Sequence, residues 1–174
     1  VVVSKPSKPA MQPQIPEPPD ADGCPAFSVS PIKLEVLENI VPLGNLNPPG
    51  HTFPTQHLYF MTEGTELINT VAPGDLTIVE VASSTKVGSD ITDYSVRFSV
   101  CTEVLGYFNH LIRISAALEQ ALALAQDTAC QEYQAGNDTF RRCTSEVNVA
   151  LKAGDKLGQV GGPQAQSAGL DFGL

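Results

Sequence analysis

Hydrophobic and polar residues alternate over much of the chain, which predicts β-strands. The alternation is clearest over residues 93–100, where Tyr94, Val96, Phe98 and Val100 fall on one face. Shorter patterns of the same kind, separated by stretches rich in Pro, Gly and Asn, predict further strands over 26–41, 57–61, 67–71, 76–81, 106–112, 146–151, 157–160 and 170–174. We therefore expect a mainly β domain.

One segment has a helical period instead. From Ser115 to about residue 134, Ala and Leu recur at a spacing of three to four residues, and neither Gly nor Pro interrupts them. Ser115 is a suitable N-cap, and Gly136 is a suitable helix end. The sequence therefore predicts one α-helix, inserted into the β domain at about residues 115–135.

The first 25 residues are rich in proline. Proline fixes φ and has no N–H group, so this segment can form neither a helix nor a central strand. We expect an extended Pro-rich N-terminal arm over 1–25, followed by a β-rich domain over 26–174. An arm of this kind could pack on a second copy of the chain, which makes self-association a candidate role. No leader pattern precedes the arm, so either a signal peptide has been removed or the numbering starts at a boundary.

The net charge narrows the choice of partners. It is −9 at pH 7. Nucleic acids and anionic membrane surfaces both require clustered Lys and Arg, so we expect no nucleic-acid partner and no attachment to such a surface. No run of about 18 apolar residues occurs either, so we expect no membrane insertion.

Four cysteines, none of them in a Cys-x-x-Cys pair, favour disulfides over a zinc ribbon. Three pairings exist, and we favour Cys24–Cys101 with Cys130–Cys143. Four buried free thiols in a cytosolic protein are the alternative. Because disulfides persist in oxidising compartments, we expect a secreted protein, extracellular or in the cell envelope. Asn137 begins an Asn-Asp-Thr sequon, so it is a candidate glycosylation site.

Two turns in the sequence are similar to each other. Residues 71–75 read Val-Ala-Pro-Gly-Asp, and residues 152–155 read Lys-Ala-Gly-Asp. Each precedes a short predicted strand that contains or ends on Val. This similarity favours a duplicated β unit.

Three segments carry a resemblance to a known family: Tyr-Phe-Asn-His-Leu at 107–111, Leu-Lys-Ala-Gly-Asp-Lys-Leu-Gly-Gln-Val-Gly at 151–161 and Ser-Ala-Gly-Leu-Asp-Phe at 167–172. They resemble the closing half of lysostaphin-like (M23) metallopeptidase domains. Residues 50–60 are similar to an earlier strand of that family. The resemblance runs from about residue 43 to the end, without the helix. It implies a barrel-sandwich hybrid fold, also called the duplicated hybrid motif.

The resemblance also implies where a zinc site would lie. In the family, zinc is bound by a His, an Asp four residues later and the last His of a His-x-His strand. His57 matches the first position, but Met61 stands at the second, and a thioether is unsuited to catalytic zinc. Gly169-Leu170-Asp171 stands in place of the His-x-His strand.

A remnant zinc site would therefore use His57, Asp171 and His51. His110 matches the histidine that assists catalysis in the family, so it is the candidate catalytic residue. The alternative is that these histidines pack and form hydrogen bonds within a β cleft.

Because the ligand set is incomplete, we expect a secreted module without catalytic activity. Such a module would bind an extracellular or cell-envelope component, or form part of an extracellular assembly. The alternative is a zinc-dependent peptidoglycan endopeptidase with an altered metal site, and zinc is the one cofactor that this alternative requires. A cell-wall or surface glycan is a candidate ligand for a cleft lined by the aromatic side chains of Tyr59, Phe60, Tyr107 and Phe108.

Overall fold

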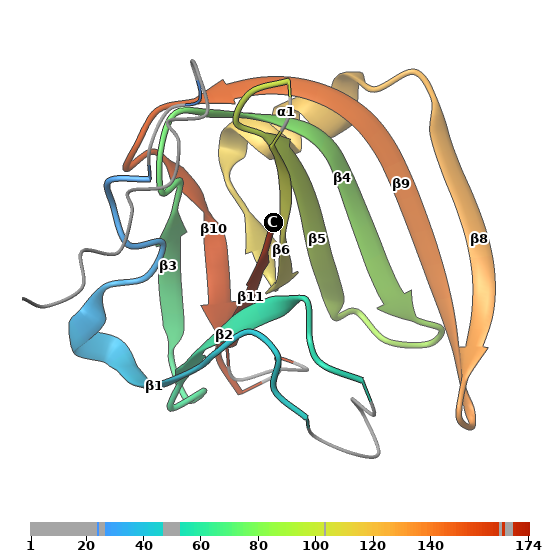
Figure 1. Ribbon diagram of the computed structural model, residues 1–174. Coiled ribbons are helices and arrows are strands. Elements are labelled where there is room, and N and C mark those ends of the chain that lie inside the picture. The colour runs from blue at the N-terminus through green and yellow to red at the C-terminus, as the bar shows by residue number, and fades with distance from the viewer. Residues whose placement is uncertain (1–23, 25–26, 47–52, 103, 164, 166–168) are drawn as a thin grey trace, which may run out of the picture.

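The structure is a computed structural model that describes residues 24, 27–46, 53–102, 104–163, 165 and 169–174 (Figure 1). The predicted arm lies outside the described residues except for Cys24, and so does His51. The described chain contains eleven strands and one α-helix, which confirms a mainly β domain.

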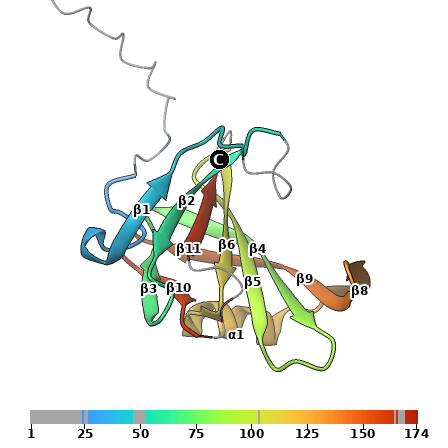
Figure 2. The same ribbon diagram turned by 90° about the horizontal axis from the view of Figure 1, so that it is seen from below.

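The strands form two antiparallel sheets. The larger sheet has eight strands in the order β1-β2-β11-β6-β5-β4-β9-β8, which Figure 2 shows from below, and the smaller has three in the order β3-β10-β7. The elements in chain order are a 3-10 helix (Leu34–Val36), β1 (Leu37–Val41), β2 (His57–Thr62), β3 (Leu67–Val71), β4 (Leu76–Lys86), β5 (Thr92–Ser99), β6 (Leu105–Leu111), β7 (Arg113–Ile114), α1 (Ala116–Leu124), β8 (Thr128–Ala135), β9 (Asp138–Leu151), β10 (Lys156–Gly161) and β11 (Gly169–Gly173).

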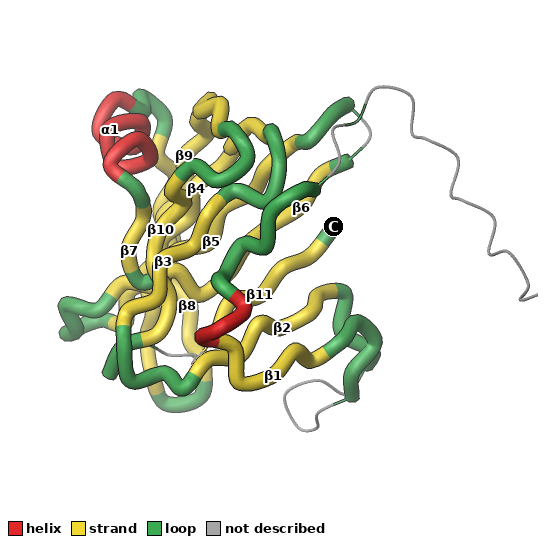
Figure 3. Tube along the Cα trace, turned by 90° about the vertical axis from the view of Figure 1, so that its left-hand side faces the viewer, coloured by secondary structure: helices red, strands yellow, loops and turns green. Residues whose placement is uncertain are grey.

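The hydrophobic core combines residues of both sheets. Ile78, Phe108 and Leu170 of the larger sheet and Leu157 and Val160 of the smaller sheet have no exposed surface. The apolar residues of the strand pattern supply this core because alternate side chains point to the same face of a strand. Helix α1 covers one end of it through the buried Leu118, as Figure 3 shows on the side of β9.

The chain passes between the two sheets at two corners, one at residues 72–75 and one at 152–155. These are the two turns whose sequences are similar. They contact each other directly, because Ala72 N–H donates to Asp155 O and Gly154 N–H donates to Ala72 O, both at 2.9 Å. Strand β3 pairs with β10 on one side of the corners and β4 pairs with β9 on the other.

The segment before β1 packs against the domain instead of forming a strand. The N–H groups of Ser28 and Val29 donate to Pro73 O, and Val71 N–H donates to Pro31 O. The Phe27 ring contacts two core phenylalanines edge-on. The predicted strand over 26–41 is therefore shorter than expected and starts only at Leu37.

The predicted helix over 115–135 is wrong in its second half. Helix α1 ends at Leu124, and residues 128–135 form β8, which pairs with β9. Gly136, with φ of 62°, and Asn137 form the two-residue turn of this hairpin, so they do not end a helix. Ala, Gln and Glu favour helices in isolation, but here the cross-strand pairs with β9 outweigh that preference.

Both disulfides have the pairing that we favoured. Cys24 is bonded to Cys101, with a sequence separation of 77, and Cys130 to Cys143, with a separation of 13. The first attaches the segment before β1 to the end of β5, and the second joins β8 to β9. Disulfides of this kind are typical of an oxidising, extracellular compartment.

We predict that the two disulfides contribute unequally to stability. Loop-closure entropy gives about 4–5 kcal/mol for the long loop and about 3 kcal/mol for the short one. The double variant Cys24→Ser/Cys101→Ser should therefore lose more free energy of unfolding than the matched variant Cys130→Ser/Cys143→Ser. Urea unfolding of both variants at one pH measures the difference, and the reverse order would contradict the prediction.

Candidate functional site

A buried carboxylate lies on the third strand of the larger sheet. Asp171 is on β11, between β2 and β6, and is only 4% exposed. A buried charge destabilises a fold unless it is paired and hydrogen-bonded, so the neighbours of Asp171 define the site.

Two histidines converge on one oxygen of this carboxylate. His57 Nε2 on β2 lies 3.4 Å from Asp171 Oδ2, and His110 Nε2 on β6 lies 3.3 Å from the same atom. The other oxygen, Oδ1, is buried and has no hydrogen-bond partner among the described residues. The strand order places these side chains together, because β11 lies between the strands that carry the histidines.

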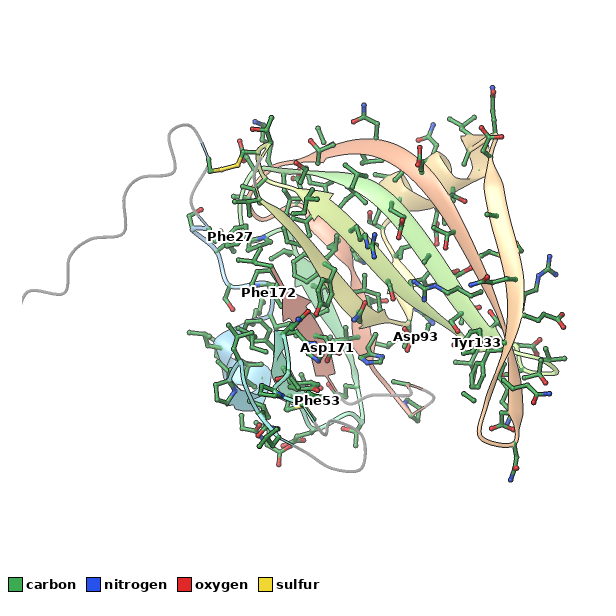
Figure 4. All side chains as sticks on the ribbon, turned by 45° about the vertical axis from the view of Figure 1, so that its right-hand side comes forward. Phe27, Phe53, Asp93, Tyr133, Asp171 and Phe172 are labelled. Atoms are coloured by element: carbon green, nitrogen blue, oxygen red, sulfur yellow. A yellow bond between two sulfur atoms is a disulfide. The ribbon has the colours of Figure 1, made fainter. Side chains whose placement is uncertain are left out.

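The second ring nitrogen of each histidine is also engaged. His110 Nδ1 lies 2.8 Å from Asp93 Oδ2, and His57 Nδ1 lies 3.1 Å from the Tyr107 hydroxyl. The result is a continuous chain of polar contacts, Asp93–His110–Asp171–His57–Tyr107, which we call the His–Asp cluster. Figure 4 labels its two carboxylates, which lie on neighbouring parts of the sheet.

A β-bulge directs His110 into the cluster. The pairing of β5 with β6 shifts between Tyr94 and Val96, so β6 has an extra residue at this point. His110 has φ of 69°, and no other non-glycine residue among those described has a positive φ. A left-handed conformation is uncommon for a residue other than glycine, and bulges occur often next to functional sites, where they re-aim a side chain. The bulge lets His110 point toward Asp171 while Phe108 and Leu111 remain fully buried in the core.

The two aspartates determine the charge of His110. Burial lowers its pKa, but the hydrogen bonds and charges of Asp171 and Asp93 outweigh burial and raise the pKa to about 10. An imidazole whose two nitrogens both face carboxylates must carry a proton on each nitrogen. His110 is therefore an imidazolium at neutral pH.

Two tyrosines, Tyr59 and the cluster residue Tyr107, stay neutral mainly because they are partly buried. Burial and the negative charge of Asp171 raise the pKa of both Tyr59 and Tyr107. The Tyr107 hydroxyl therefore keeps its proton, and it can serve as donor or acceptor toward His57.

Two glycines flank Asp171, and neither position has room for a side chain. A Cβ on Gly169 would lie 2.5 Å from the Phe60 carbonyl oxygen, and a Cβ on Gly173 would lie 2.4 Å from the Tyr107 ring. The first of these starts the Gly169–Asp171 segment, which the predicted resemblance matches to the His-x-His strand of M23 domains. A histidine at Gly169 would therefore clash with the backbone of β2.

The structure brings together three of the four predicted site residues: His57, His110 and Asp171. His51 lies outside the described residues. Within the described ranges, no group of three or more His, Cys, Asp or Glu side chains is arranged to hold a metal ion. Met61 lies opposite Gly169 in the pairing of β2 with β11.

Asp93 is not among the site residues predicted from the sequence. Tyr107, which the sequence predicts to line a cleft, lines the hollow described below and also contacts His57 through its hydroxyl group. Asp93 lies in the strand with the clearest alternation, on the polar side, where a carboxylate normally faces solvent. Only the register of β5 with β6 shows that it meets His110. Of the four aromatic residues predicted to line a cleft, Phe108 is fully buried and therefore not available to a ligand, and Phe60 is partly buried against the core.

A hollow adjoins the cluster on the same side of the sheet. It has a volume of about 620 Å³ and crosses β4, β5, β6 and β9 where the pairing of β4 is shifted by a bulge between Ile78 and Glu80. Its lining combines apolar, aromatic and charged residues: Val79, Glu80, Arg97, Leu105, Gly106, Tyr107, Glu146, Val147 and Asn148. Tyr107 belongs to both the hollow and the cluster.

Comparisons with family models, curated proteins and solved structures found no significant match. The M23 resemblance therefore stays a prediction. Among the described residues, no helix has the length and apolar character needed to cross a membrane.

We predict that His110 makes stability depend on pH. Its pKa in the fold is about 10, above the ordinary value of 6.5. Its contribution is therefore complete below about pH 6.5 and is lost as the pH rises toward 10. The free energy of unfolding should fall between pH 7 and 9.5, and His110→Gln should show a shallower fall over the same range.

Chemical denaturation at half-unit pH steps measures this effect. His57→Gln is the matched control, because it removes a histidine from the same cluster but leaves the Asp93–His110–Asp171 contacts in place. Equal pH slopes for the wild type and His110→Gln would contradict the assignment of His110 as an imidazolium.

Proposed function

We propose that this chain is a secreted or cell-envelope domain without peptidase activity, built on the barrel-sandwich hybrid fold. The two corners with similar sequences support the fold assignment, because they relate β3–β4 to β9–β10 as a duplicated unit would. The two disulfides support the extracellular location.

The observation that carries this proposal is the way in which His110 is held. Both of its ring nitrogens face carboxylates, Asp93 at 2.8 Å and Asp171 at 3.3 Å. A nitrogen that donates a proton to a carboxylate has no lone pair for a metal, and zinc requires neutral imidazole. His110 therefore contributes an ionic contact to the fold and does not act as a ligand or a general base.

The remaining residues do not complete a zinc site. The family pattern would need an oxygen or nitrogen ligand at Met61 and a histidine where Gly169 lies against the backbone of β2. His57 and Asp171 supply two ligands from the described residues, fewer than the three protein ligands of catalytic zinc sites. The ligands that are present therefore favour a cluster that stabilises the fold over a zinc site.

The hollow beside the cluster is the surface that we assign to binding. Tyr107 offers an aromatic face, and Glu80, Arg97 and Asn148 offer hydrogen-bonding groups around it. Aromatic rings with nearby polar side chains suit a ligand that has both apolar and hydroxyl-bearing faces, as sugars do. A cell-wall or surface glycan is therefore the ligand class that we propose.

One observation favours the second candidate, a zinc-dependent peptidoglycan endopeptidase with an altered site. Asp171 Oδ1 is buried without a hydrogen-bond partner among the described residues, and a cation would satisfy it. In that case His57, Asp171 and His51 would hold the ion.

Metal analysis distinguishes the two candidates. We predict less than about 0.1 zinc per chain after purification in the presence of zinc and dialysis, and no loss of turbidity when the protein is added to cell walls. About one zinc per chain, retained in Asp93→Asn and lost in Asp171→Asn, would replace the proposal with the endopeptidase.

We also predict that binding depends on the hollow. Isolated cell-wall glycan or a glycan array should retain the protein, and Arg97→Ala should weaken retention at least about fivefold by removing one charged hydrogen-bond donor. Arg141→Ala is the matched control, since it makes the same change in net charge on β9, away from the hollow. Equal retention of both variants would remove the hollow as the binding surface, and no retention of the wild type would remove glycans as the ligand.

A further inference from the structure

Strand β8 is a fully exposed edge. All eight of its residues are exposed, and it is the last strand of the larger sheet. Figure 1 shows it at the outer right, with β9 on one side and no described element on the other. It pairs with β9 without any shift in register from Thr128 to Ala135.

The disulfide shows which backbone groups of β8 face solvent. Cys130 and Cys143 are directly opposite, and their Cα atoms are 4.1 Å apart. This short separation is typical of a non-hydrogen-bonded antiparallel pair, whose N–H and C=O groups point away from the partner strand. The outward-pointing groups of β8 are therefore those of residues 128, 130, 132 and 134.

The other sheet edges are less available. Strand β1 has five residues and a bulge between Leu37 and Asn39, and β7 has two residues. Strand β3 is partly covered, because Val71 N–H donates to Pro31 O. Long, regular edges are normally blunted by Pro, Lys or a bulge, and β8 has none of these.

We propose that β8 pairs antiparallel with β8 of a second copy of this chain, about a two-fold axis at Gln131, to form a continuous sheet. In antiparallel pairing, opposite residues must point to the same side of the sheet, so the axis must pass through a residue. An axis at Glu132 would place two carboxylates opposite each other. An axis at Gln131 places Glu132 opposite Cys130 of the other copy and Tyr133 opposite Ala129, so no like charges lie directly opposite each other.

In the same register, all the outward-pointing N–H and C=O groups of β8 can form hydrogen bonds with the other copy. Residues 130 and 132 of the two copies, and likewise 128 and 134, become hydrogen-bonded pairs, while Gln131 becomes a non-hydrogen-bonded pair at the axis. The pairing in the dimer thus continues the pairing pattern that β8 already has with β9.

The dimer is expected to be weak and to depend on salt. One strand pair is smaller than a standard interface, which gives a Kd on the order of 100 µM. Two chains with a charge of −9 each repel one another. Screening this repulsion with 0.5 M NaCl should therefore strengthen the dimer relative to 0.05 M NaCl.

Sedimentation equilibrium of the full chain up to 1 mM, in 0.5 M NaCl, tests the proposal with two matched variants. Glu132→Pro removes a solvent-facing N–H and no bond to β9, so it should raise the Kd at least about tenfold. Glu132→Thr makes the same change in charge, keeps the N–H and should dimerise like the wild type. Circular dichroism and thermal unfolding check that both variants fold.

A distance measurement tests the register independently of the proline variant. With the axis at Gln131, nitroxide amino acids at position 134 of the two copies lie six residues apart along the strand, about 20 Å. Pulsed dipolar spectroscopy should find this distance. A monomer at 1 mM, a dimer unaffected by Glu132→Pro, or a clearly different distance would each overturn the proposal.

Discussion

The contact between the two corners holds the two sheets in their relative positions. At residues 72–75 and 152–155 the chain leaves one sheet for the other, and the corners exchange backbone hydrogen bonds through Ala72, Gly154 and Asp155. The Lys152–Asp75 ion pair is also present, but it is exposed, and exposed pairs contribute little. The backbone bonds therefore fix the corners. The strand pairs β3–β10 and β4–β9 both start at the corners. The backbone hydrogen bonds between the corners therefore also determine how far apart the sheets lie, and so the space that the core must fill.

The His–Asp cluster follows from the position of β11 in this arrangement. The Asp171 carboxylate, on the third strand of the larger sheet, is almost completely removed from water, so its neighbours must neutralise it. His110 does so from a left-handed backbone conformation that costs about 1–3 kcal/mol. Charged hydrogen bonds to Asp171 and Asp93 offset this strain, which is why a bulge with a non-glycine residue is maintained in an otherwise regular strand pair.

Much of the fold could be predicted from the sequence, because the strands that bury one face have a period of two. The strands near 57–61, 67–71 and 93–100 appear close to their predicted bounds. The prediction failed at β8, whose residues are all exposed and therefore carry no apolar alternation. Its Ala, Gln and Glu residues also have high helix propensity, so the local sequence favours a helix.

The candidate site could be predicted only in part, for a different reason. His57, His110 and Asp171 lie in segments that resemble the M23 family, and in the structure both histidines do contact Asp171. Asp93 could not be found in this way, because its contact with His110 depends on the bulge. A bulge shifts the register by one residue, and a shift of one residue reverses which side chains share a face.

The His–Asp cluster affects the stability of the fold more directly than it affects ligand binding at the surface. Asp171 lies between Leu170 and Phe172, which pack in the core, so a substitution at Asp171 disturbs β11 as well as the cluster. The hollow shares only Tyr107 with the cluster. Arg97 lies on β5, four residues after the cluster residue Asp93, and Asn148 lies on β9, which carries no residue of the cluster. Loss of binding after a substitution at Asp171 would thus combine unfolding with loss of contact. Substitutions of the charged residues of the hollow can separate an effect on binding from an effect on folding. These side chains belong neither to the core nor to the contact between the two corners.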